Sequence, residues 1–203
     1  MTADGRPPTA GERPMKDDGQ RPTEARAPMP IVVEDVSFTY PSGTHALRGV
    51  SLRVSPGEAV AIVGENGAGK TTLVKHLNGL LKPGTGRVTI GDWDTREHTV
   101  AKMAARVGYV FQNPDDQIVE RTVGDEVAFG PRRLGQPAAE QQANVAAALA
   151  TVGLTEAAKT HPYDLTAPQR KLVTLASVLA MRTPIVIFDE PTMGQDARGV
   201  ALI

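Results

Sequence analysis

The sequence predicts an α/β fold that carries a helical insertion. Two continuous apolar runs, AVAIV at 59–63 and IVIF at 185–188, have the length of strands buried in a parallel sheet. Between them, the periodicity of residues from about 122 to 181 is mostly helical. Strands that alternate with helices in this order are typical of α/β proteins.

Two antiparallel strands are expected at the start of the ordered region, which is predicted to begin at Ile31. In VSFTY, residues 36–40, apolar and polar side chains alternate, and apolar positions recur in LRGVSLRV, residues 47–54. The PSG triplet at 41–43 separates the two segments and supplies a turn.

The elements that follow alternate between strands and helices. The AVAIV strand leads into a glycine-rich loop and then into a helix over 71–82, which is expected to end near the Pro-Gly pair at 83–84. Short strands are expected at 87–90 and 107–111, ahead of the helical segment. The IVIF run then closes the predicted sheet.

Residues 1–30 are predicted to be a disordered tail. They include six prolines, five basic and five acidic residues, but no Val, Ile, Leu or Phe that could build a core. A docking segment or an interdomain linker is the alternative interpretation. Residues 31–203 are expected to form the folded domain.

The overall composition argues against several classes of protein. The 203 residues include 22 Lys plus Arg and 23 Asp plus Glu, so the net charge of −1 gives no electrostatic reason to expect a nucleic-acid partner. Without cysteine there is no disulfide, thiolate metal site or thiol nucleophile. No apolar run approaches the ~18 residues that span a bilayer, so any membrane role is expected to depend on a partner.

The glycine-rich loop GENGAGKTT, residues 64–72, fits the phosphate-binding pattern G-x-x-x-x-G-K-[ST]. Gly67 and Gly69 let the backbone curl around phosphate oxygens at the positive end of the helix dipole. Lys70 supplies a charge for the β- and γ-phosphates, and the Thr71 hydroxyl can bind Mg²⁺. A glycine-rich turn with a chance lysine is disfavoured by the flanking strand and helix. The predicted nucleotide-binding residues of the loop are Gly64, Glu65, Asn66, Gly67, Ala68, Gly69, Lys70, Thr71 and Thr72.

An acidic pair ends the IVIF strand in IVIFDEP, residues 185–191. Ligands of open α/β sheets bind at this edge of the sheet. Asp189 is predicted to hold Mg²⁺ through water, and Glu190 is predicted to be the general base that polarises an attacking water. A solvated pair without function is the alternative, which the presence of the phosphate loop disfavours.

With these motifs in order, the chain from about Ile31 onward resembles the ABC-type ATPases. The resemblance implies a P-loop NTPase fold with a RecA-like core, an N-terminal antiparallel β subdomain and a helical subdomain at about 113–182. It also implies that Tyr40 stacks on adenine, that Gln112 is the catalytic Q-loop glutamine that senses Mg²⁺, and that Asp196 belongs to the D-loop. The implied cofactors are ATP and Mg²⁺.

The segment VFQNPDDQIVERTVGDEVAFGP, residues 110–131, is similar to ATPases of energy-coupling-factor (ECF) and cobalt-type importers. Such proteins power uptake of vitamins or transition-metal ions. The resemblance implies a second ABC ATPase subunit, a transmembrane coupling subunit and a separate substrate-binding membrane subunit. It places the chain at the cytoplasmic face of the membrane and leaves the substrate unnamed.

The segment DLTAPQRK, residues 164–171, occupies the place of the family's Leu-Ser-Gly-Gly-Gln signature. By resemblance, the residues that contact ATP bound on the partner subunit are Thr166, Ala167, Pro168 and Gln169. Pro168 has no N–H to donate, and loss of such a charge-assisted bond removes ~1.5–3 kcal/mol. We therefore hypothesise a heterodimer with unequal sites. The alternative is that proline is tolerated in the first turn of the helix and the signature still works.

The resemblance also implies a switch histidine beyond the D-loop, whereas the sequence ends at Ile203. The chain is therefore expected to be a fragment or a truncated product. The four histidines are expected to be surface or hydrogen-bonded residues. Two functions remain open: an ATP-hydrolysing importer subunit, or a non-catalytic nucleotide-binding module that regulates an ATPase partner. A soluble ABC protein that acts on nucleic acid or ribosomes is disfavoured by the neutral charge.

Overall fold

The structure is a computed structural model that describes residues 29–194. An antiparallel sheet with strand order β2-β1-β3-β4 opens the described part. Its strands are β1 (Ile31–Thr39), β2 (His45–Val54), β3 (Thr85–Ile90) and β4 (Trp93–Asp94). The turn after β1 is closed by the amide of Gly43, which donates to the Tyr40 carbonyl at 2.8 Å. The predicted antiparallel strands are thus confirmed.

Helix α1, Lys70–Leu77, packs its apolar side against this sheet. Leu73 and Leu77 join a core that includes Val36 and Val88, both fully buried. The helix ends earlier than the predicted residue 82 because Gly79 adopts a left-handed φ of 77°.

The second sheet is a parallel pair of strands that are distant in sequence, β5 (Val107–Val110) and β6 (Ile185–Phe188). Val107 lies opposite Ile185, and Val110 lies opposite Phe188. Because parallel strands share their carboxyl ends, the residues after Val110 and after Phe188 meet at one edge. Those residues include Gln112 and the acidic pair.

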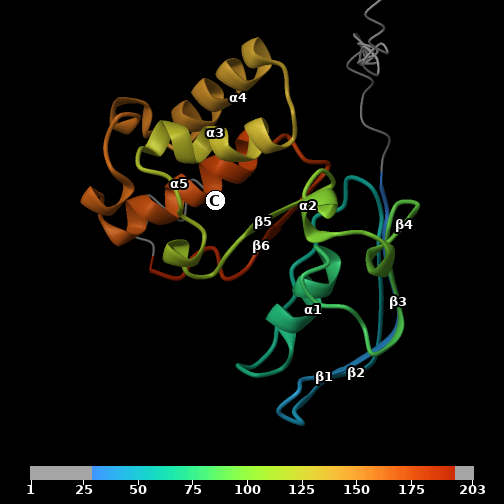
Figure 1. The fold of residues 1–203 in the computed structure, drawn as a ribbon. Helices are drawn as coiled ribbons and strands as arrows, with labels where there is room; N and C mark the ends of the chain where they lie inside the picture. Colours follow the sequence, from blue (N-terminus) through green and yellow to red (C-terminus); the bar gives the residue numbers. More distant parts are fainter. Residues whose placement is uncertain (1–28, 195–203) are drawn as a thin grey trace, which may run out of the picture.

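Three helices form a layer beside this parallel pair: α3 (Val123–Arg133), α4 (Ala138–Thr151) and α5 (Ala167–Ala180). They share an apolar core with Val110. Figure 1 shows this layer on one side and the antiparallel sheet with α1 on the other, with β5 and β6 between them. The shorter elements are η1 (Thr95–Glu97), α2 (Val100–Met103), η2 (Pro114–Asp116), η3 (Thr155–Ala157) and η4 (Pro162–Asp164). None of the helices within residues 29–194 is long and apolar enough to cross a bilayer.

The prediction of a buried strand at 59–63 is wrong for this structure. These residues form no strand, and the exposed fractions of Val60, Ile62 and Val63 are 45%, 39% and 90%. A strand requires a neighbouring strand for its backbone hydrogen bonds. Within residues 29–194, neither sheet places a strand beside this segment.

Candidate nucleotide-binding site

The glycine-rich loop leads directly into the N-terminus of helix α1. Gly67 and Gly69 adopt left-handed φ angles of 83° and 90°. A Cβ atom on Gly69 would lie 2.5 Å from the carbonyl oxygen of Ala46 on β2. Gly69 is therefore required both by its backbone conformation and by the close approach of the neighbouring strand.

Lys70, the first residue of α1, folds back across this loop. Its Nζ donates to the carbonyl oxygens of Gly64 and Glu65 at 2.8 and 2.9 Å. The ammonium group and the positive end of the helix dipole therefore lie together inside the loop. This arrangement favours a bound anion such as a phosphate group.

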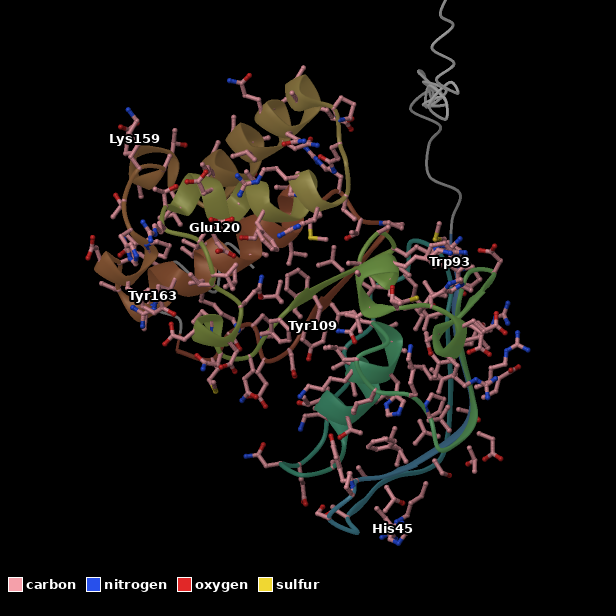
Figure 2. The ribbon with its side chains drawn as sticks, viewed as in Figure 1. His45, Trp93, Tyr109, Glu120, Lys159 and Tyr163 are labelled. Atoms are coloured by element: carbon pink, nitrogen blue, oxygen red, sulfur yellow. The ribbon has the colours of Figure 1, made fainter. Side chains whose placement is uncertain are left out.

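Asp189, which directly follows β6, is joined to α1 and β5 by hydrogen bonds. Its Oδ1 accepts from the Thr71 hydroxyl at 3.1 Å, and its Oδ2 accepts from the Tyr109 hydroxyl at 2.7 Å. Figure 2 labels Tyr109, which extends from β5. Burial and the adjacent Asp189 carboxylate raise the pKa of the Tyr109 hydroxyl, so it remains a donor.

The oxygen atoms at this point fit a magnesium ion. The Thr71 hydroxyl and the Asp189 carboxylate lie at hydrogen-bond distance, and Asp189 is only 7% exposed. Within residues 29–194 there is no group of three or more His, Cys, Asp or Glu side chains that could hold a metal by themselves. Mg²⁺ typically uses one or two protein oxygens together with water and substrate phosphates, which matches this sparse donor set.

Glu190 and Gln112 are brought together at the edge of the parallel strands. The Gln112 Nε2 donates to Glu190 Oε2 at 2.8 Å, although the residues are 78 positions apart in sequence. Glu190 has a φ of 50°, a left-handed conformation that is uncommon for a residue with a side chain. Such outliers concentrate at functional sites, where the surrounding structure holds them.

Tyr40 directly follows β1 and lies close to the start of α1. Its hydroxyl is 3.0 Å from the Thr72 hydroxyl, and its ring packs edge-on against Phe38 at 5.0 Å between ring centroids. The structure thus places Tyr40 beside the predicted phosphate loop. Its stacking on adenine stays a prediction.

The signature segment forms the N-terminus of helix α5. Thr166 is the N-cap of this helix: its hydroxyl accepts from the Gln169 amide at 3.5 Å, and the Gln169 Oε1 accepts from the Thr166 amide at 3.0 Å. Pro168 lies in the first turn, where proline is compatible with a helix. The contact of this segment with ATP on a partner stays a prediction, and Asp196 lies outside the described residues.

Sequence reasoning did not identify two residues of the site, Tyr109 and Lys171. Tyr109 donates to Asp189, and Lys171 donates to the backbone carbonyls of Phe111 and Gln112. An apolar run that contains one tyrosine gives no sign that its hydroxyl reaches an acid 80 residues away. Lys171 comes shortly after the signature, and in the sequence it has the pattern of an ordinary solvent-exposed charged residue on a helix.

A phosphate loop at a helix N-terminus, opposite an Asp-Glu pair at the end of a parallel strand, defines a P-loop nucleotide-binding protein. A family model described as ABC transporter matches residues 47–193. The chain therefore belongs to the ABC transporter family, as an ATP-binding subunit and an ATPase of the ABC type.

Curated relatives agree with this assignment. A putative ABC transporter ATP-binding protein of Geobacter sulfurreducens is 48% identical over 166 residues, which are 82% of this chain and 67% of the relative. The energy-coupling factor transporter ATP-binding protein EcfA of Methanothermobacter thermautotrophicus is 46% identical over 168 residues. That match spans 82% of this chain and 54% of the EcfA protein.

Solved structures share the fold. CbiO1 from Clostridium perfringens, described as part of the ABC transporter complex cbiONQ, has a TM-score of 0.73 and 36% identity, covering 84% of this chain and 69% of that protein. A dimeric ATP-binding cassette bound to ADP and Pi in a post-hydrolysis state has a TM-score of 0.76 and 27% identity. This second match covers 85% of this chain and 79% of that cassette.

Proposed function

We propose that the chain is the ATP-hydrolysing subunit of an ECF- or cobalt-type importer, which couples ATP hydrolysis to uptake of a vitamin or metal ion. The observation that carries the hydrolytic role is the hydrogen bond from Gln112 to Glu190, beside the linked Thr71 and Asp189. The EcfA and CbiO1 relatives support the importer type.

In this function the loop residues bind the nucleotide phosphates. Phosphate oxygens replace the Gly64 and Glu65 carbonyls as partners of the Lys70 ammonium. In this proposal the Tyr40 ring stacks on the base of the nucleotide, and its hydroxyl contact with Thr72 beside the phosphate loop supports that role. Bound Mg²⁺ would neutralise phosphate charge, and Thr71, Asp189 and Gln112 would hold it directly or through water.

Glu190 acts as the general base in this proposal. Its carboxylate accepts a proton from the attacking water, and Gln112 orients the carboxylate through the bond to Oε2. The left-handed backbone at Glu190 turns the chain directly after β6.

The proposed assembly contains a second ABC ATPase subunit, a transmembrane coupling subunit and a substrate-binding membrane subunit, and it lies at the cytoplasmic face of the membrane. Helices α3 to α5 belong to a helical subdomain at about 113–182. Thr166 to Gln169 contact the ATP held by the second subunit, and the missing N–H of Pro168 weakens that contact. A non-catalytic regulatory module is the second candidate, and Pro168 is the observation that favours it.

Glu190-dependent turnover separates the two candidates. The variant Ala167→Gly/Pro168→Gly restores two glycines in the signature, so two copies of it form sites with a regular signature. We expect this variant to hydrolyse ATP and to lose at least about a hundredfold of that turnover on Glu190→Gln, with ATP still bound. ATP binding without Glu190-dependent turnover in the glycine variant would instead favour the regulatory module.

A further inference from the structure

Lys171 is a buried lysine whose contacts have no role in the chemistry proposed above. It lies on α5 in the turn after the signature residues and is only 3% exposed. Its Nζ donates to the carbonyl oxygens of Phe111 at 2.6 Å and Gln112 at 2.7 Å. One ammonium group therefore joins the signature helix to the backbone that carries Gln112.

Two further contacts join α5 to the same loop. Arg170 Nε donates to Asp115 Oδ1 at 2.9 Å. Gln117 Nε2 donates to the Thr174 carbonyl at 3.2 Å, while Gln117 Oε1 accepts from the Phe111 amide at 3.1 Å. Residues 111–117 are thus held along α5, and Lys171 makes the contact nearest to Gln112.

The electrostatic environment is compatible with a charged lysine at this position. Burial lowers the pKa of Lys171, whereas the carboxylates of Asp189 and Glu190 oppose that shift. The two backbone carbonyls direct their oxygens at the ammonium group, which satisfies a buried cation.

We propose that Lys171 is a positioning residue, which fixes the Phe111–Gln112 backbone so that the Gln112 amide stays on Glu190. The inference rests on the proposed hydrolytic function. It adds a physical connection between two sites. Thr166, which is expected to contact ATP on the partner, caps helix α5. Lys171, in the next turn of α5, holds the backbone of Gln112, and Gln112 orients Glu190. Movement of α5 therefore changes the position of Gln112.

Hydrogen exchange tests the backbone part of this inference without any turnover. Lys171→Met removes the donor, and we expect the backbone amides of 111–113 and 115–117 to exchange about tenfold faster, because their anchor on α5 is lost. Lys171→Arg keeps the charge and N–H donors and restores more than half of the protection. The matched control is Lys159→Met, which removes an exposed lysine at the outer edge of the helical layer (Figure 2). Unchanged exchange in a folded Lys171→Met protein would overturn the inference.

Kinetics in the glycine-signature background test the positioning part. We expect Lys171→Met to lower kcat about tenfold with less than about a twofold change in KM for ATP, because the phosphate loop is unchanged while Gln112, and with it Glu190, is displaced. In a Gln112→Ala background the same substitution should lower kcat no further, because both act through one contact. An equal loss in both backgrounds would contradict the inference.

If Lys171→Met does not fold, a second variant, Lys171→Gln, replaces it in the test. Lys171→Gln is one atom too short to reach both carbonyls, and it is expected to give the same loss of kcat. Failure of the proposed function is distinguishable from failure of this inference. A parent glycine variant without Glu190-dependent turnover refutes the former, whereas the exchange measurement alone decides whether Lys171 anchors the loop.

Discussion

Asp189 is the residue at which separate parts of the chain converge. Thr71 reaches it from α1 and Tyr109 reaches it from β5, and each donates to a different carboxylate oxygen. The Tyr109 contact orients the carboxylate so that Oδ1 faces the phosphate loop. In the proposed function, this orientation lets a single acid present an oxygen to Mg²⁺ beside Thr71.

Tyr109→Phe tests this orientation. Loss of the hydroxyl leaves the buried Oδ2 without its donor, which is expected to cost about 1–3 kcal/mol of stability. The Mg²⁺ concentration needed for half-maximal binding of a fluorescent ATP analogue should rise about threefold to tenfold. Tyr163→Phe is the control, because Tyr163 is 50% exposed on the helical layer (Figure 2). Equal shifts in both variants would contradict the role of Tyr109.

His76 is expected to make the stability of the protein depend on pH. It is fully buried, with its Nδ1 2.7 Å from the Thr72 carbonyl, and burial lowers its pKa below the usual 6.5. Below about pH 6.5 the unfolded chain therefore binds more protons than the folded chain at this residue, and stability falls as the pH decreases. Urea unfolding at about pH 7.5 and 5.5 should show a smaller pH effect in His76→Gln. An unchanged pH effect would exclude His76 as its source.

At the scale of elements, the glycine loop depends on its packing against β2. Gly69 combines a φ of 90° with a would-be Cβ contact of 2.5 Å to Ala46, whereas Gly43 has a φ of 88° with open space around it. Comparing the two glycines therefore distinguishes the cost of a left-handed backbone from the cost of a steric clash. Both have a left-handed backbone, but only Gly69 is packed against a neighbouring strand.

Gly69→Ala and Gly43→Ala form a matched pair. Gly43→Ala should destabilise the protein by about 1 kcal/mol, because only the left-handed backbone is penalised. Gly69→Ala should cost about 2 kcal/mol more and abolish ATP binding, because the loop must move away from β2. Urea unfolding and nucleotide binding measure the two effects, and equal losses of stability would contradict the packing argument.

Element prediction from sequence succeeded where the local signal and the observed contacts agree. The IVIF strand and the hairpin of β1 and β2 were predictable from apolar runs, alternation and turn residues. The end of α1 was missed because the apolar pattern continues past Gly79, which breaks the helix by its φ angle. The phosphate-loop and acidic-pair motifs predicted Thr71 and Asp189 as ligands of one Mg²⁺, and the structure places the two side chains at hydrogen-bond distance. Tyr109 and Lys171 make long-range contacts that leave no local pattern in the sequence.

At the scale of the whole molecule, residues 59–63 are the main departure from prediction. An apolar run of this kind indicates burial, yet Val63 is 90% exposed. The apolar composition predicts that the segment favours a buried strand, whereas actual burial depends on whether a neighbouring strand pairs with it. An exposed apolar segment of this length is also prone to pair with another chain.

Val63→Lys tests the exposure of this segment. Because the side chain is solvent-exposed, the free energy of unfolding should change by less than about 0.5 kcal/mol. Self-association measured by light scattering should decrease, since a charge on an exposed strand-forming segment opposes intermolecular pairing. A loss of more than about 2 kcal/mol would show that Val63 is buried in solution and contradict the exposed conformation.

The central proposal is that this chain carries a phosphate loop and a Glu190–Gln112 pair that support ATP hydrolysis, together with a signature that Pro168 weakens. A mixing experiment tests it most directly. The parent chain is combined with an Ala167→Gly/Pro168→Gly/Glu190→Gln variant, whose own catalytic site is disabled but whose signature is restored. We expect the mixture to hydrolyse ATP at least about tenfold faster than either protein alone, because the parent's Glu190 then meets a regular signature. A mixture no faster than its components would contradict the claim.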